Sequence, residues 1–430
     1  MKLSLFSTLQ GYRKEYLLKD IFSGIIIAAV SIPISMGYAQ ISGIPAVYGL
    51  YGSVLPILLF ALFSTSRQFI FGVDAAPAAI VGGALSTLGI AAESEAAMDY
   101  VPAIALFAGL WLFVFFLLHA DKIVDFISTP VMGGFISGIA VTIILMQIPK
   151  LMGSPAGSGE LLELAEHIFA AAKNISWLSL CMGLGALILI RIFKKLAPKF
   201  PMAIAIMALG VLSTVVFHVD EKGVVLLQSV ERGLPSLVIP DFGNVDLTQA
   251  AGRGLMVAVV IMAETLLAEN TFAFRNDYKL NDRQEILACA AGNIAAAAVG
   301  CCPVNGSISR TSLNEQYGGK SQAVSITAGI TMALILLFGT GFIGYLPVPV
   351  LTAIVISALM DVVETHLAVR LFKVSRTEFY IFMAAGFSVL CLGTIYGVII
   401  GILLSFVAVI LKATNPPRSC LLYTSDAADD

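Results

Sequence analysis

The sequence contains little charge for its length. Asp, Glu, Lys and Arg together make up 12% of its 430 residues, whereas about a quarter of a soluble domain is charged. The net charge of −3 is small, and no dense basic patch of the kind that binds nucleic acid is present. Hydrophobic residues reach 58%, with a mean hydropathy of +0.93. These values exclude a soluble protein and predict a membrane protein without a nucleic-acid partner.

The sequence also lacks the residue patterns of an enzyme. Its six cysteines do not have metal-ligand spacing, and the adjacent Cys301 and Cys302 have a poor geometry for a disulfide. Its four histidines are scattered, and neither a nucleophile–base constellation nor a phosphate-binding loop is present. We therefore predict that the protein is not an enzyme and uses no cofactor and no metal.

Long apolar runs are abundant, and the alternating pattern of a β-barrel is absent, so the runs predict membrane-spanning helices. At roughly 20 residues per span, the chain holds about fourteen. The first run follows "GYRKEYLLKD" without a small-residue cleavage site, which predicts a retained helix and not a signal peptide. The predicted spans start near Asp20, Ala46, Ala75, Val101, Val131, Trp177, Met202, Leu255, Asp282, Ser307, Ala323, Pro347, Phe379 and Thr394.

Basic residues gather in connections that follow an even-numbered span. They precede the first span and follow the fourth, sixth, eighth and twelfth. Positive charge marks the cytoplasmic side, so an even number of spans places both termini in the cytoplasm and the protein in the inner or plasma membrane. The segment "VETHLAVRLFKVSRTEF" alternates apolar and basic residues, which predicts a helix at the membrane surface.

The longest polar insert, residues 218–249, divides the spans into seven and seven. We predict a first repeat over residues 1–217 and a second over residues 218–413. An odd number of spans per repeat forces opposite orientations, which is the inverted-repeat plan of many secondary transporters. The third span of each half is short and interrupted, with "FGVDAAPAAIVGGAL" in one half and "NGSISRTSLNEQYGG" in the other.

A helix that begins inside the membrane leaves its first N–H groups without partners in the helix. The dipole end carries about half a positive charge, so an anion is the favoured ligand there. Ser307, Ser309 and Asn305 are candidates to cap the second half-helix or to donate hydrogen bonds. Arg310 adds a full positive charge, unless it pairs with a buried acid, and Gly306 allows close approach of the backbone to a ligand.

Two stretches resemble the SulP/SLC26 family of anion transporters: "DIFSGIIIAAVSIPISMGYAQISGIPAVYGLYGSVLPILLFALFSTSR" and "PVNGSISRTSLNEQYGGKSQ". The similarity extends from Asp20 to about Leu411. It implies an all-α polytopic fold of fourteen segments in seven-plus-seven inverted repeats, with half-helices 3 and 10 meeting near the midplane. It also implies a core of spans 1–4 and 8–11, a gate of spans 5–7 and 12–14, and an elevator-like movement between them.

The resemblance also implies a set of substrate-binding residues: Tyr38, Asp74, Ala75, Ala76, Ser307, Ile308, Ser309 and Arg310. Many relatives have glutamine after the proline of span 1, where this chain has Ile34. Asp74 would repel an anion unless it were protonated or paired, and we expect its carboxylate to cap the first half-helix instead.

Glu264 lies in an apolar part of span 8, where a carboxylate is costly to ionise and tends to hold a proton. We predict that it couples transport to protons. The alternative is a static ion pair with Arg310. Sodium-dependent relatives carry a hydroxyl residue four positions after this acid, and Ala268 stands there. Glu269 lies nearer the cytoplasmic end and is expected to be solvated or paired with Arg275 or Lys279.

The function predicted from these residues is secondary active transport of a small anion, with a proton as the coupling ion. Sulfate is the first candidate, and bicarbonate and dicarboxylates are others. A nucleobase symporter of the same fold and an uncoupled anion channel are the alternatives. The resemblance makes a homodimer plausible. Relatives usually continue into a STAS domain, and the tail, residues 414–430, has the character of a truncated or non-native end.

Overall fold

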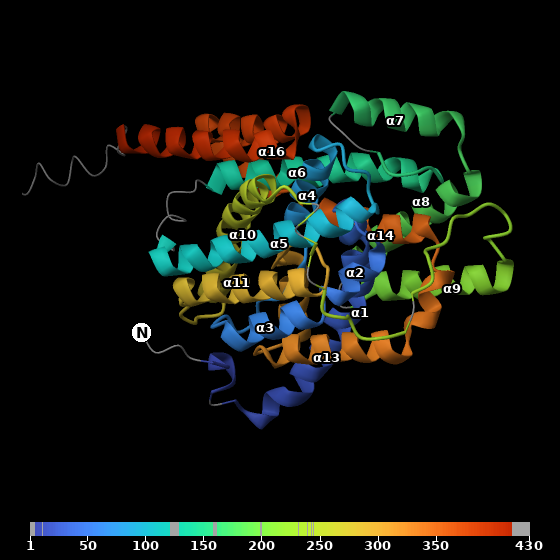
Figure 1. The fold of residues 1–430 in the computed structure, drawn as a ribbon, viewed down its shortest axis with the longest axis horizontal. Coiled ribbons are helices and arrows are strands. Elements are labelled where there is room, and N and C mark those ends of the chain that lie inside the picture. The colour runs from blue at the N-terminus through green and yellow to red at the C-terminus, as the bar shows by residue number, and fades with distance from the viewer. Residues whose placement is uncertain are drawn as a thin grey trace, which may run out of the picture.

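The computed structural model describes residues 5–10, 12–120, 129–157, 161–197, 200–230, 232–238, 240–241, 243 and 245–414. Most of these residues are helical, and several long helices run roughly parallel across the view, among them α5, α6, α11, α13 and α16 (Figure 1). The C-terminal tail, which we interpreted as a truncated or non-native end, lies outside the described residues beyond residue 414.

The helices of the first half follow the predicted spans closely. Two short 3-10 helices, Ser7–Leu9 and Lys14–Tyr16, precede them. The first half contains α1 (Leu17–Ile41), α2 (Ala46–Tyr51), α3 (Leu55–Phe63), α4 (Ala75–Thr87), α5 (Glu95–Leu118), α6 (Thr129–Leu151), α7 (Leu161–Lys173), α8 (Trp177–Leu196) and α9 (Met202–Phe217). The second predicted span is broken into α2 and α3 by a turn at residues 52–54. The amphipathic helix α7 was not predicted.

The second half contains α10 (Leu247–Arg275), α11 (Asp282–Ala298), α12 (Ile308–Tyr317), α13 (Ala323–Phe338), α14 (Val348–Val362), α15 (Thr365–Val374) and α16 (Arg376–Thr414), with a 3-10 helix at Thr340–Tyr345. The predicted surface helix is present as α15. Gly393 has a φ of 81°, a left-handed conformation that favours glycine, and it breaks α16 where spans 13 and 14 were expected to meet.

Seven segments of the described chain are long and apolar enough to cross a membrane, judged by length and composition. Several of the other helices are shorter. Among them, α4 has 13 residues and α12 has 10. Each of these two helices directly follows a three-residue strand: β1 (Phe71–Val73) precedes α4, and β2 (Val304–Gly306) precedes α12. The two interrupted spans of the sequence are therefore strand–helix units.

Helix packing divides the described residues into two groups. In one, α5 packs on α10 and α11, α3 on α11 and α13, and α1 on α2 and α13. In the other, α6 packs on α8, α14 and α16, and α9 packs on α8 and α14. These groups are the core and the gate expected for the fold. The two groups meet where α1 packs on α14 and α4 packs on α6.

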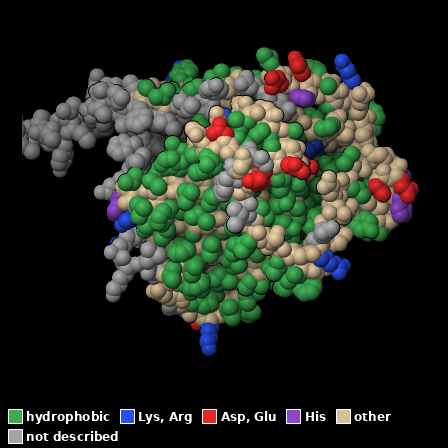
Figure 2. Space-filling model, viewed as in Figure 1, with side chains coloured by type: hydrophobic (Ala, Val, Ile, Leu, Met, Phe, Trp, Pro, Cys, Tyr) green, Lys and Arg blue, Asp and Glu red, His purple; other side chains and the backbone are tan. Residues whose placement is uncertain are grey.

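The outer surface suits a lipid environment. Large hydrophobic side chains are exposed along α5, α8 and α9, including Leu118 at 71% and Phe217 at 62%. Figure 2 shows hydrophobic side chains over much of the visible face, with Lys and Arg mainly at its rim and Asp and Glu both at the rim and in the upper part of the face. Since burial of apolar area in water would drive these faces together, their exposure fits helices that are solvated by lipid.

Candidate functional site

The two strand–helix units meet through antiparallel pairing of β1 and β2. Phe71 pairs with Gly306, and Val73 pairs with Val304. The pairing is extended by Ser307, whose N–H donates to the carbonyl of Ile70 at 2.8 Å. Because the strands are antiparallel, α4 and α12 leave the pair in opposite directions and their N-termini face a common region. The contact joins segments more than 200 residues apart in the chain.

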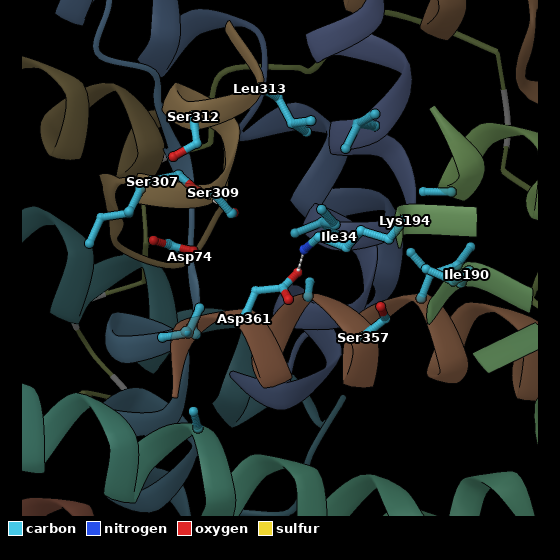
Figure 3. A pocket seen from close by; sticks show the side chains of 18 of the residues that line it. Ile34, Asp74, Ile190, Lys194, Ser307, Ser309, Ser312, Leu313, Ser357 and Asp361 are labelled. Atoms are coloured by element: carbon cyan, nitrogen blue, oxygen red, sulfur yellow. Dashed lines mark hydrogen bonds and ion pairs between the residues drawn. The ribbon is translucent and has the colours of Figure 1, made fainter. Parts of the chain in front are cut away.

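A cavity of about 410 Å³, which we call the central cavity, lies at these two N-termini. Asp74, Ser307, Ser309 and Ser312 lie close together on one side of it (Figure 3). Its walls are mostly apolar and come from both the core and the gate. Six of the predicted substrate-binding residues line it, namely Asp74, Ala75, Ala76, Ser307, Ile308 and Ser309.

The helix ends offer hydrogen-bond donors to this cavity. In α4, Ala75 and Ala76 are in the first turn, and Pro77 follows without an N–H. In α12, the first-turn N–H groups belong to Ile308, Ser309 and Arg310, while the next N–H, of Thr311, already donates to Ser307 at 3.0 Å. First-turn N–H groups have no intrahelical partner, so both ends favour a negatively charged ligand.

Arg310 lies behind the strand pair and does not line the central cavity. Its side chain is 1% exposed, and Nη2 donates to the carbonyl of Val73 at 2.7 Å. Gly72 makes room for it, since a Cβ there would be 2.9 Å from Nη1. Within the described part of the chain Nε has no hydrogen-bond partner, and Arg310 takes part in no ion pair. The predicted alternative of a pairing with a buried acid is therefore wrong.

Tyr38 is 2% exposed and does not line the central cavity, whereas Ile34, one helical turn earlier in α1, does. Tyr38, which was predicted to contact the substrate, therefore lies behind the surface that a ligand would touch. Ile34 presents an apolar side chain at the position where a glutamine would offer an amide.

Glu264 lines the cavity and ends a chain of buried hydrogen bonds. The amide of Asn305 donates to Glu264 Oε2 at 2.7 Å, and Thr265 Oγ1 donates to Asn305 Oδ1 at 2.6 Å. The N–H of Gly306 donates to Thr265 Oγ1 at 3.2 Å. No ion pair involves Glu264 among the described residues, so the static pair with Arg310 is absent. The chain ties the acid of α10 to the strand that precedes α12.

Three local roles predicted from the sequence are wrong. Asp74 occupies the N-cap position of α4, but its side chain makes no capping hydrogen bond. Asn305 is held by Glu264 and does not cap α12. Gly306 does not make space for a ligand, because a Cβ there would lie 1.9 Å from the ring of Phe69. In each case a tertiary contact takes the place of the local one.

Glu269 was expected to be solvated or paired with Arg275, and it is neither. It is fully buried, and Arg275 pairs with Glu315 at 3.2 Å. Near it lies Glu285, also fully buried, which accepts hydrogen bonds from Ser64 Oγ at 2.7 Å and from Thr65. Glu285 thereby ties α11 to the segment after α3, away from the central cavity.

At the rim of the cavity, Asp361 of α14 forms ion pairs with Lys194 and, at 2.8 Å, with Arg191 of α8 (Figure 3). Sequence analysis missed this cluster, together with the cavity-lining hydroxyls of Ser312 and Ser357. No motif marks these residues, because α8, α12 and α14 are far apart in the chain. The basic cluster at the end of α8 was noted only as an orientation signal.

The geometry described so far defines a polytopic membrane transporter with two half-helices that face a common site. The model of the sulfate permease family matches residues 17–385. A probable sulfate transporter of Mycobacterium tuberculosis is 26% identical over 417 residues, which cover 97% of this chain and 74% of that protein. The chloroplastic sulfate transporter 4.1 of Arabidopsis thaliana is 30% identical over 422 residues, which cover 96% and 61%.

Solved structures show the same fold. The transmembrane domain of the cyanobacterial bicarbonate transporter BicA superposes with a TM-score of 0.81 at 20% identity, covering 90% of this chain and 98% of that one. Murine Slc26a9 in its inward-facing state gives a TM-score of 0.85 at 19% identity, covering 94% and 70%.

The chain belongs to the sulfate permease family. Its fold of seven-plus-seven inverted repeats, with a core and a gate, is confirmed, and it is an anion transporter and not an enzyme.

Proposed function

We propose that the protein is a proton-coupled symporter of a small anion, with sulfate as the first candidate. The observation that supports this most directly is the composition of the central cavity. Four carboxyl groups line it: Asp361 pairs with Lys194 and Arg191 at the rim, Glu364 lies in the connection before α15, and Asp74 and Glu264 share the cavity with the N-termini of α4 and α12. A site built for an anion alone would have no use for two acids.

The charges at the site explain why protons are needed. Each helix N-terminus contributes roughly +0.5, and Arg310 behind the strands contributes one full charge, giving about +2. If Asp74 and Glu264 are both ionised, the sum is about zero and a divalent anion is not attracted. One proton restores about +1 and two restore about +2, which balances sulfate. Protonation therefore prepares the site for the anion, and release of the anion favours release of the protons.

The polar groups of the cavity suit a compact oxyanion. Ser309, Ser312 and Ser357 offer hydroxyl donors, and the first-turn N–H groups add further donors. The walls between them are mostly apolar side chains. Bicarbonate and small dicarboxylates carry the same type of acceptor, so they are the next candidates.

Alternating access is proposed to occur by movement of the core against the gate. The central cavity is lined by both groups of helices, since α4, α10 and α12 belong to the core and α6, α8 and α14 belong to the gate. Displacement of one group would carry the half-helix site along the other. We further propose repeats that divide at residues 217 and 218, cytoplasmic termini, a plasma or inner membrane location and a homodimer.

The test is uptake of labelled sulfate into proteoliposomes with and without an inward proton gradient. We expect stimulation by the gradient in wild type, and uptake without stimulation in Glu264→Gln, because an amide cannot release a proton. Glu95→Gln, at an exposed position in the first turn of α5, is the matched control and should behave as wild type. Equal wild-type uptake with and without the gradient would refute proton coupling. Absence of uptake would refute sulfate as the substrate.

A further inference from the structure

A second cavity, of about 720 Å³, lies further along the helices that line the central cavity. In α1, Ile34 lines the central cavity and Gln40 lines the second one. In α6, residues 136–140 contribute to the central cavity and Lys150 to the second, and in α14 the corresponding parts are residues 354–362 and 348–349. The two cavities therefore follow one another along the helix axes.

Tightly packed side chains separate the two cavities. Residues 35–39 of α1 and 350–353 of α14 are all buried. Gly37 has no room for a side chain, because a Cβ there would lie 2.4 Å from Cγ2 of Val355. Since α1 belongs to the core and α14 to the gate, this contact closes the path between core and gate. The second cavity is thus a separate compartment on the far side of the closure.

The second cavity contains one cation whose charge is not balanced by a close partner. Lys150 Nζ donates to Oε1 of Gln40 at 3.0 Å, and the described residues include no ion pair with Lys150. An ammonium group has three donors, and a neutral amide satisfies one of them without compensating the charge. The carboxylate of Glu93 lines the same cavity but lies beyond ion-pair distance.

We propose that Lys150 and Gln40 form an anion-binding site in the second cavity, where a small oxyanion of the transported class is held before it reaches the half-helices. The inference rests on the proposed function. The anion accepts hydrogen bonds from the free Nζ donors, and Glu93 competes with it for the same charge. The orientation predicted from basic residues places this cavity on the extracellular side, so the site acts on anions that arrive from outside.

The contact between Lys150 and Gln40 also crosses the boundary between gate and core. Movement of the core relative to the gate must separate these two side chains, which exposes all three Nζ donors to the cavity. A site on the extracellular side would therefore bind its anion best when the pathway opens towards that side.

The test compares sulfate uptake into intact cells with uptake into inverted membrane vesicles from the same cells. For Lys150→Gln we expect the extracellular KM to rise about tenfold, which corresponds to about 1.4 kcal/mol, with an unchanged KM in inverted vesicles. Lys150→Arg keeps the charge and should stay within about threefold of wild type. Glu93→Gln removes the competitor and should lower the extracellular KM. Lys173→Gln, at the exposed end of α7 on the same side, is the control for general surface charge.

An unchanged extracellular KM in Lys150→Gln, or equal changes from both sides, would overturn the proposal even when wild-type transport is normal. If wild type takes up no sulfate, the proposed function fails. The site in the second cavity is then tested by sulfate binding to the purified protein, measured as an increase in Tm. Stabilisation that is lost in Lys150→Gln and kept in Lys150→Arg supports the site, and equal stabilisation of all three proteins rejects it. If Lys150→Gln does not fold, Glu93→Gln decides: a lower extracellular KM than in wild type, with Lys150→Arg within about threefold of wild type, supports the site, and an unchanged KM in Glu93→Gln rejects it.

Discussion

Replacement of Thr265 by valine tests whether the hydrogen-bond chain from Glu264 holds the site together. The change keeps the shape of the side chain and removes one hydroxyl. That hydroxyl donates to Asn305 Oδ1 at 2.6 Å and accepts from the N–H of Gly306 at 3.2 Å. Thr265 and Asn305 are both fully buried, so water does not replace either bond.

The expected loss of stability follows from the two groups left without partners. A buried donor or acceptor that loses its partner costs about 1–3 kcal/mol, so the two together cost about 4 kcal/mol. The added methyl group returns about 0.8 kcal/mol through burial, which leaves a net loss of about 3 kcal/mol. With an unfolding entropy of about 2.1 cal/mol/K per residue, a chain of 430 residues loses about 1 °C of Tm per kcal/mol.

We therefore expect Thr265→Val to lower Tm by about 3 °C in detergent, measured by fluorescence-detected size exclusion after heating. Thr271→Val is the matched control in the same helix, because the hydroxyl of this exposed residue donates only to the carbonyl of Leu267. It should change stability by no more than about 0.5 kcal/mol. Equal midpoints for the two variants would show that the chain of hydrogen bonds does not stabilise the junction of α10 and β2.

Two further changes test other parts of the structure. Gly306→Ala places a Cβ 1.9 Å from the ring of Phe69, so we expect the yield of folded protein to fall sharply, whereas Gly252→Ala, with open space around it, should express normally. Asp361→Asn removes two ion pairs that are partly exposed, so Tm should move by less than the equivalent of about 1 kcal/mol, and a larger drop would mean that the rim cluster holds α8 to α14.

The sequence by itself determined the membrane class, several of the helix starts and the two half-helices. The physical reason is that a bilayer makes strong local demands: an apolar run must be long enough to cross it, and each interruption requires a partner for the exposed backbone. The runs that start at Ala46, Trp177 and Ala323 therefore begin within a residue of the observed helices. The break in α16 at Gly393 directly precedes Thr394, where the last predicted span starts.

Only the tertiary structure decided which residues face the site. Arg310 of α12 donates to β1, and Tyr38 is buried within α1. Neither side chain lines the central cavity. Asn305 is a residue type that often caps helices, but its amide donates to Glu264 of α10 instead. Lys150 appears in the sequence as one basic residue at the end of a span, and its contact with Gln40 exists because α6 passes α1. Local rules assign elements, whereas side-chain partners depend on segments that are distant in the chain.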